Sequence, residues 1–320
     1  MSITITGGFT LAGGGWTVVP PPPNIRAIFG FGCCPVTAIT NIVSNTGTVA
    51  TDTAGVGTAK WILAAASYGT DKAIFGYGMN TPGNRISLTN KVSNTGVVAT
   101  DTTGVGTART QLAAAGYGTD KAIFGYGNDG NGYSNAGWSL TNKVSNTGVV
   151  AGDTTGVGTG RSILAAATYG TDKAIFGYGY APGINLACSM TNKVSNTGVV
   201  ATDTAGVGTG RSNLAAAGYG TDKAIFAYGD TVGNGTTTAI SNLVSNTGVV
   251  ATNTTGVGTA RLGLAAAGYG AGNAIFGYGT NQVGTTLSLT NKVSDTGVVA
   301  TDTTGVGTVR SSLAAATFGS

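Results

Sequence analysis

Short apolar runs separated by glycine-containing turns follow one another along almost the whole chain. Within residues 110–160 the pattern gives four runs: Gln111–Tyr117, Lys121–Tyr126, Ser139–Ser145 and Val149 to about Thr155. Val, Thr and Ile are frequent here and Gly recurs every few residues, which disfavours helices and favours strands. Turn-forming residues such as Asn146-Thr147-Gly148 lie between the runs. The pattern predicts four short antiparallel strands in this unit.

The same unit recurs six times. Ala-Ile-Phe places its Phe at 29, 75, 124, 176, 226 and 276, and Leu-Ala-Ala-Ala begins at 63, 112, 164, 214, 264 and 313. Four short strands at a period of roughly 50 residues are typical of a propeller blade. We therefore expect an all-β six-bladed β-propeller over residues 24–320, preceded by a separate segment, residues 1–23. A β-solenoid with two coils per repeat is the alternative fold.

The two ends of the repeat region favour a closed ring. The chain enters its first unit at Arg26-Ala27-Ile28-Phe29, a second strand, and stops after Leu313–Phe318, a first strand. The C-terminal strand is therefore expected to complete the N-terminal blade, since a ring leaves no sheet edge open.

The order of motifs resembles that of kelch-type propellers. The stretch from Ala108-Arg109 to Tyr117 is similar to a kelch first strand, and Asp120–Gly127 is similar to the second strand with its glycine pair. The resemblance covers residues 24–320 and implies a ring of four-stranded blades. A propeller resembling the regulator of chromosome condensation is a further alternative.

Composition narrows the class of protein. Gly supplies 56 of 320 residues without a three-residue period, which excludes collagen, and 41% hydrophobic residues argue against disorder. The formal charge of +4 has no clustered basic stripe, so we expect no nucleic-acid binding. No stretch of 18 apolar residues exists, so no membrane span is expected, and Met1–Thr10 shows no secretory signal.

Residue types that carry most catalysis and metal binding are scarce. His and Glu are absent, and the cysteines are Cys33, Cys34 and Cys188. An odd count with two adjacent residues, which strains direct pairing, indicates free thiols rather than a disulfide framework. The repeated Asp-Thr-Thr-Gly-Val-Gly lacks the alternating acids of a calcium loop, and one unit has Asn253 instead. We expect a non-enzymatic protein with no cofactor and no metal.

Strand order assigns the loops to two faces. We call upper the face with the loops from second to third strand and from fourth to next first strand, and lower the opposite face. The lower turns are nearly constant, whereas the second-to-third loops differ in every unit. Repeated frameworks with divergent loops on one face commonly carry binding sites; unconstrained drift is the alternative.

Candidate ligand-binding residues lie on the upper face. One cation precedes each first strand, and the six are expected to circle the channel mouth and attract an anion: Lys60, Arg109, Arg161, Arg211, Arg261 and Arg310. Alternatively, each pairs with an acid such as Asp101 or Asp153, or with loop carbonyls. The variable loops add candidates for contacting or stacking on a sugar: Arg85, Tyr133, Trp138 and Tyr180.

The N-terminal segment differs from the repeats. Ser2–Thr6 alternates like a strand, Trp16–Val19 is strand-like, and Pro20–Pro23 is a stiff spacer. The segment leads into a second strand from the lower face. We expect it to be an anchor, with Ile3, Ile5, Trp16 and Val18 as anchoring residues; a flexible terminus is the alternative.

These features favour a recognition protein of a virus particle. The glycine-rich repeats resemble those of structural proteins of marine and cyanobacterial phages. That resemblance implies a tail, fibre or capsid-decoration component located in the virion. Residues 1–23 would bind other virion proteins, and the variable loops a host-surface glycan or receptor. Two alternatives are a free carbohydrate-binding propeller and a glycosidase using Asp129 and Asp230, the only non-repeated acids of the upper loops.

Overall fold

The regular structure in the described part of this protein is β. A computed structural model describes residues 9–12, 15–18, 24–81, 83–130, 137–183, 186–231 and 235–319, and no helix occurs within them. The described strands form six three-stranded and five two-stranded antiparallel sheets. The all-β prediction is therefore confirmed.

Each three-stranded sheet contains one first, one second and one third strand of the repeat. The first strands are β6 (Ala64–Tyr68), β10 (Ala113–Tyr117), β13 (Ala165–Tyr169), β18 (Ala215–Tyr219), β24 (Ala265–Tyr269) and β28 (Ala314–Phe318). The second strands are β3 (Arg26–Gly30), β7 (Lys72–Gly76), β11 (Lys121–Gly125), β14 (Lys173–Gly177), β19 (Lys223–Ala227) and β25 (Asn273–Gly277). The third strands are β4 (Thr40–Val43), β9 (Thr89–Val92), β12 (Thr141–Val144), β17 (Thr191–Val194), β22 (Ser241–Val244) and β27 (Thr290–Val293).

The two-stranded sheets are short additions. Four of them involve the upper loops: β5 (Lys60–Trp61) with β8 (Met79–Asn80), β15 (Tyr180–Ala181) with β16 (Leu186–Ala187), β20 (Asp230–Thr231) with β21 (Thr236–Thr237), and β23 (Arg261–Leu262) with β26 (Thr280–Asn281). The fifth pairs β1 (Phe9–Ala12) with β2 (Gly15–Val18).

The predicted fourth strand is reduced to two bridges per unit. In the β10 sheet these are Val144↔Val150 and Thr141↔Thr154. Three residues of the outer run therefore face two residues of β12, which is the geometry of a β-bulge. The side chain of Asn142 occupies the gap and donates to Ala151 O at 3.1 Å. The prediction of four continuous strands is thus only partly met.

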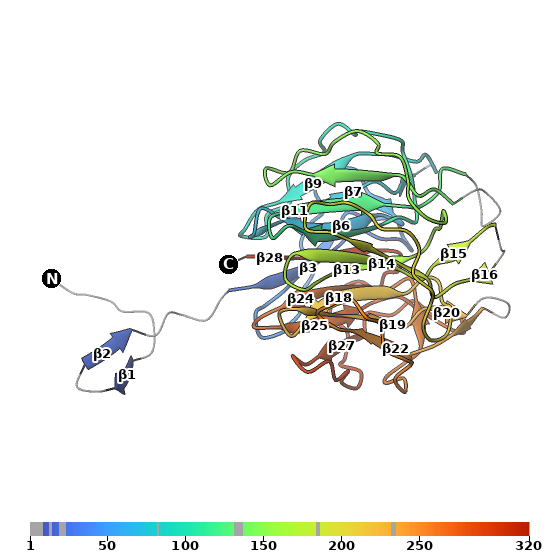
Figure 1. Ribbon diagram of the computed structural model, residues 1–320. Helices are drawn as coiled ribbons and strands as arrows, with labels where there is room; N and C mark the ends of the chain where they lie inside the picture. Colours follow the sequence, from blue (N-terminus) through green and yellow to red (C-terminus); the bar gives the residue numbers. More distant parts are fainter. Residues whose placement is uncertain are drawn as a thin grey trace.

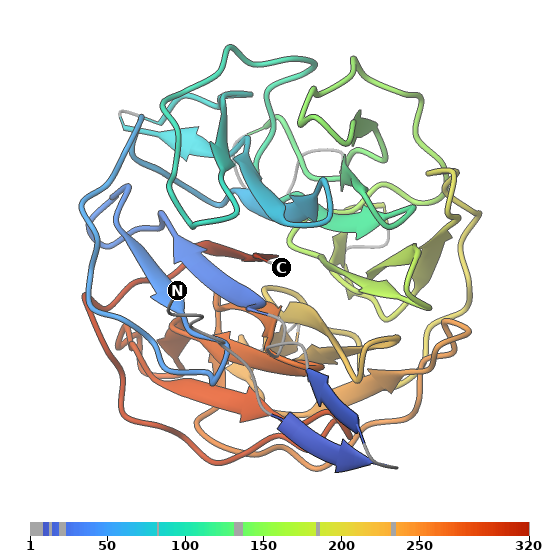
Figure 2. The ribbon, with the colours of Figure 1, turned by 90° about the vertical axis from the view of Figure 1, so that its left-hand side faces the viewer.

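The first and last strands of the repeat region are paired. β28 runs antiparallel to β3, with Ala314 opposite Gly30 and Phe318 opposite Arg26. Each first strand also contacts the first strands of both neighbouring sheets, including β28 with β6. Figure 2 shows the sheets arranged around a central axis, with the red C-terminal strand beside the blue β3.

Small residues let the sheets pack closely. Phe124 of β11 lies so close to Gly76 that a Cβ added there would come within 2.8 Å of its ring, and the Phe124 and Tyr77 rings are 5.1 Å apart. The same aromatic contact recurs between the last and first units, where Phe29 meets Tyr278 at 5.2 Å. The Ala-rich first strands line the central channel, where larger side chains would collide.

Two sets of main-chain hydrogen bonds run around the axis without a break. We call the first the lower ring; its N–H donors and C=O acceptors are Gly69→Asp120, Gly118→Asp172, Gly170→Asp222, Gly220→Gly272, Gly270→Ile25 and Gly319→Asp71. The second, the upper ring, joins Gln111→Ile62, Ile163→Gln111, Asn213→Ile163, Gly263→Asn213, Ser312→Gly263 and Ile62→Ser312. Each ring therefore links all six units through backbone atoms.

The pair of strands β1 and β2 lies on the lower side. In Figure 1 the β1–β2 pair stands beside the end of the molecule where β3 begins, and β15, β16 and β20 lie at the opposite end. Its register pairs Phe9 with Val18 and Leu11 with Trp16. Of the predicted anchoring residues, Trp16 and Val18 are in β2, whereas Ile3 and Ile5 lie outside the described residues.

Deleting residues 314–320 is expected to destabilise the protein strongly, because β3 loses its partner and Phe318, 1% exposed, is removed. The free energy of unfolding should fall by at least about 4 kcal/mol, the cost of losing one buried aromatic side chain. Urea denaturation followed by fluorescence measures it. Deleting residues 1–23 is the matched control and should leave the midpoint unchanged; equal midpoints for both deletions would contradict the β28–β3 pairing.

Candidate functional site

The six predicted cations are buried. Lys60, Arg109, Arg161, Arg211, Arg261 and Arg310 are each 0% exposed. An anion at the channel mouth therefore cannot reach these side chains, in contrast to the predicted ring of accessible charges. Their positions are instead explained by contacts at the boundaries between sheets.

Arg109 illustrates the arrangement. Its guanidinium lies over the ring of Tyr77 from the preceding sheet, 5.0 Å from the ring centre. On the other side Nη2 donates to Asn142 Oδ1 at 2.7 Å and Nε donates to Tyr126 O at 3.0 Å. Nη1 lies 3.3 Å from Asp153 Oδ1. The charge is thus buried with an aromatic face, an amide, a carbonyl and a carboxylate around it, which offsets its desolvation.

The bulged Asp completes this cluster. Asp153 Oδ2 accepts from Thr107 N at 2.9 Å and Thr107 Oγ1 at 2.7 Å, and Oδ1 accepts from Asn142 Nδ2 at 2.9 Å. Burial alone raises the pKa of Asp153, but these bonds and the Arg109 charge outweigh it and hold the pKa below its usual value. The Asp of the repeated Asp-Thr-Thr motif therefore fixes the connection entering each sheet. Thr308 and Asp52 make the same contact between the last and first units.

The tyrosines whose rings face the cations are neutral. Burial raises the pKa of Tyr77, Tyr126, Tyr178 and Tyr228 to about 12. Each hydroxyl therefore keeps its proton and donates to the carbonyl of a loop valine, as from Tyr77 to Val105 O at 3.0 Å.

Two boundaries depart from this pattern. At the first, Lys60 replaces Arg and lies 4.9 Å from the ring of Phe31, which replaces Tyr. Lys60 Nζ donates to Asn90 Oδ1 at 2.7 Å, and burial lowers the pKa of Lys60 to about 8. At the other, Asn253 replaces Asp, so Arg211 lacks the ion pair that Arg161 makes with Asp203 at 3.6 Å, although Nη1 and Nε of both arginines have no hydrogen-bond partner within the described ranges.

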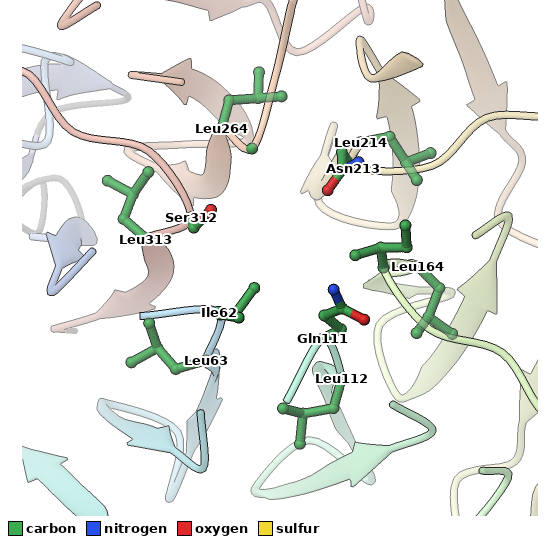
Figure 3. Close-up of a pocket in the computed structure, with 12 residues that line it drawn as sticks. Ile62, Leu63, Gln111, Leu112, Leu164, Asn213, Leu214, Leu264, Ser312 and Leu313 are labelled. Atoms are coloured by element: carbon green, nitrogen blue, oxygen red, sulfur yellow. The ribbon is translucent and has the colours of Figure 1, made fainter. Parts of the chain in front are cut away.

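The upper mouth of the channel is the strongest candidate site. A cavity with an empty volume of about 410 Å³, including space open to solvent, is lined by one Leu per unit and the residue before it. The residues before Leu are those of the upper ring, and all adopt positive φ, from 49° to 62°. Positive φ is an outlier for β-branched Ile62 and Ile163, so the ring of hydrogen bonds enforces it. Figure 3 shows Gln111 and Asn213 extending toward the centre of the cavity.

The mouth is uncharged and has a mixed lining. Asn128 Nδ2 donates to Gln111 Oε1 at 2.5 Å, and Asn213 Nδ2 donates to Asp230 Oδ1 at 3.0 Å. These bonds orient the two amides. They leave the N–H donors of the Gln111 amide and the carbonyl oxygen of Asn213 for a ligand. Ile62 and Ile163 supply apolar surface beside them. Such a site suits a neutral ligand that carries both hydroxyl or amide groups and an apolar face.

The predicted loop residues are not gathered into one site. Trp138 Nε1 donates to Asp129 Oδ1 at 2.9 Å, whereas Tyr180 is 7% exposed and lies in β15 of the next unit. Arg85 belongs to the loop after β8, and Tyr133 lies outside the described residues. Both non-repeated acids therefore accept side-chain hydrogen bonds from neighbours, Asp129 from Trp138 and Asp230 from Asn213.

The mouth residues were missed in the sequence, although a signal was present. The residue before Leu-Ala-Ala-Ala differs almost everywhere (Ile62, Gln111, Ile163, Asn213, Gly263, Ser312), whereas the cation two positions earlier hardly changes. Variation at one position of an otherwise constant motif indicates that the side chain at that position makes no contact on which the framework depends.

The described residues contain no group of three His, Cys, Asp or Glu side chains that could hold a metal ion. Likewise, no helix among them is long and apolar enough to cross a membrane.

Comparisons with known proteins show the fold but no family. No protein-family model matches the chain, and no curated protein matches it. Among solved structures, the structure of YjhT aligns with a TM-score of 0.66 at 14% sequence identity, covering 86% of this chain and 95% of that one. At this identity the likeness is one of fold alone.

Replacing Lys60 by Arg should change how stability depends on pH. Lys60 has its pKa lowered from 10.5 to about 8 by burial, so between these values the folded state has released a proton that the unfolded state still binds. Stability of the wild type therefore rises across this window, by on the order of 3 kcal/mol relative to Lys60→Arg. Urea denaturation from pH 7 to pH 11 checks this. Parallel curves for the two proteins would show that Lys60 does not titrate there.

Replacing Asn253 by Asp is expected to stabilise the protein. The new carboxylate gives Arg211 Nη1 the partner that Arg109, Arg161, Arg261 and Arg310 already have. An ion pair of this kind, between a buried guanidinium and a partly exposed carboxylate, contributes about 1 kcal/mol. The gain is present at neutral pH and disappears as pH falls through the lowered pKa of the new carboxyl. The reverse change, Asp203→Asn, is the matched control and should lower the urea midpoint at pH 7.

Proposed function

We propose that this chain is a six-bladed β-propeller closed by β28, and that it serves as a non-enzymatic recognition protein of a bacteriophage particle. In this proposal residues 1–23 attach it to other virion proteins, and the upper face binds a host-surface glycan. The observation that carries the proposal is the concentration of variation on the upper face, around a framework that repeats most of its contacts from one boundary to the next.

The closed ring is supported by contacts that cross from the last unit to the first. β28 pairs with β3, Thr308 binds Asp52, and Arg310 Nη2 donates to Asn41 Oδ1 at 2.6 Å. The upper and lower rings of main-chain hydrogen bonds also pass through this junction. An open solenoid has no reason to repeat its internal contacts between its two ends.

The absence of catalysis is supported by how the acids are used. Asp52, Asp101, Asp153, Asp203 and Asp302 each bind a Thr of the incoming connection. Glycoside hydrolysis needs two carboxyl groups in unlike environments at one site. Asp129 and Asp230 belong to different units and are bonded to Trp138 and Asn213, so they form no such pair.

The chemistry of the mouth indicates a neutral ligand. The cations are buried, and the groups left for a ligand are the amides of Gln111 and Asn213 with the side chains of Ile62 and Ile163. Sugars without charge match this combination, since they present hydroxyls at their edges and apolar faces between them.

Glycan binding should therefore depend on the mouth and hardly on salt. Gln111→Gly and Asn213→Gly remove the amides without straining the backbone, because Gly263 already occupies the equivalent position at φ 62°. Binding of neutral glycans on an array, or of labelled protein to host cells, should weaken roughly tenfold or more in each variant, the effect of losing about 1.4 kcal/mol.

The matched control for these variants is Val199→Thr on the lower face, where Val199 is 62% exposed and Thr48 is its counterpart in the first unit. Its binding should equal that of the wild type. Binding that collapses as salt is raised would instead indicate an anionic ligand held by surface charge.

Location in a particle is tested separately. Cryo-electron microscopy of phage particles that contain this chain should find residues 1–23 covered by other virion proteins and the upper face outward. Particles with the upper face buried, or none containing the chain, would overturn the virion assignment while leaving the glycan test intact.

A further inference from the structure

Two adjacent cysteines lie at the junction between the first and last units. Cys33 and Cys34 follow β3 in the first upper loop, and their Sγ atoms are 2.9 Å apart. This separation exceeds the length of a disulfide bond, roughly 2.05 Å, by less than about 1 Å. The structure thus brings together two thiols that adjacency alone would not orient toward each other.

The two thiols have unequal surroundings. Cys33 is 7% exposed, its N–H donates to Ser311 O at 2.9 Å, and its C=O accepts from Ser311 N at 3.3 Å. Cys34 is exposed and can be reached by a solute. Cys188 is buried, and its Sγ lies near the carbonyls of Tyr178 and Gly179, at 3.7 and 3.4 Å. Only the first loop therefore combines an accessible thiol with a second thiol beside it.

We propose that Cys33 and Cys34 form an oxidation site that closes reversibly to a disulfide between neighbouring residues when the protein meets a hydroperoxide. This role goes beyond the proposed function and does not depend on it. The pair lies on the upper face, where the β28–β3 junction meets the variable loops.

The reaction has two steps. The Cys34 thiolate attacks one peroxide oxygen, the O–O bond breaks, hydroxide leaves, and Cys34 becomes a sulfenic acid. Cys33 then attacks the sulfur of Cys34, the S–O bond breaks, and water leaves as the disulfide forms. The two thiols are together oxidised by two electrons and hydrogen peroxide is reduced to water. Burial and the contact with Cys34 raise the pKa of Cys33 to about 11, which assigns the first step to the exposed Cys34.

Adjacency makes the product easy to reduce. Consecutive Cα atoms are about 3.8 Å apart, whereas disulfides usually span roughly 4.4–6.8 Å, so the bond is strained. Strained and exposed disulfides exchange with thiols more readily than structural ones. Reversal therefore needs only a dithiol reductant.

Mass spectrometry of the full-length protein tests the proposal without any substitution. The protein is treated with hydrogen peroxide, denatured, alkylated with iodoacetamide and cut with trypsin. Peptide 27–60, which contains both cysteines, should carry no alkyl group and be two hydrogen atoms lighter than its reduced, unalkylated form. Treatment with dithiothreitol before alkylation should give the peptide with both alkyl groups. Peptide 174–193, which contains Cys188, is the internal control and should remain alkylated throughout.

A variant separates this route from general oxidation. In Cys34→Ser the remaining Cys33 should stay alkylated at peroxide doses that close the pair in the wild type. Cys188→Ser should behave as the wild type does in peptide 27–60. The proposal is overturned if oxidised wild type carries a sulfinic or sulfonic acid on Cys34 beside an alkylated Cys33. Dimers linked through Cys34 on a non-reducing gel would overturn it as well.

Discussion

A buried cation at each boundary between sheets is the constraint on which the rest of the repeat depends. A fully desolvated guanidinium is strongly destabilising unless its charge and its donors are matched. The preceding sheet supplies a Tyr ring, the third strand supplies Asn, and the bulge supplies Asp. Tyr77 itself has a φ of 64° and is followed by Gly78, so the end of the second strand turns where it can face Arg109. Apart from Phe31, Lys60 and Asn253, these residues are the same in every unit, because removal of one leaves a charge uncompensated.

The polar residues that hold the sheets together are distinct from the residues that vary at the mouth and in the loops. The aspartates of the bulges, the asparagines of the third strands and the arginines before the first strands are residue types that active sites use, and here they are engaged between sheets. Main-chain bonds, not side chains, hold the upper ring, so residues as different as Ile62, Gln111 and Gly263 share one backbone conformation. Side chains at the mouth can therefore change without altering the scaffold, and the same freedom holds for the second-to-third loops.

Strand pattern and turn chemistry predicted the first three strands of the unit at residues 110–160 to within two residues, because alternation and glycine placement are local properties. The bulge was not predictable this way, since it depends on Asn142 replacing a main-chain partner for Ala151. The burial of the cations could not be predicted either, because a Lys or Arg before each first strand is equally compatible with an exposed ring of charges and with burial. The discriminating signal was the Asn inside every third strand, a polar residue at a position that a sheet interior rarely accepts without a charged partner.

The two rings of main-chain hydrogen bonds affect the rate at which the protein unfolds. A row of repeats has terminal units, which fray first and let unfolding spread inward. Here the two sets of hydrogen bonds link every unit to a unit on either side, so bonds of both sets must break before any sheet can separate. Much of the barrier to opening is therefore met at the first break, so the folded lifetime should exceed what equilibrium stability alone suggests.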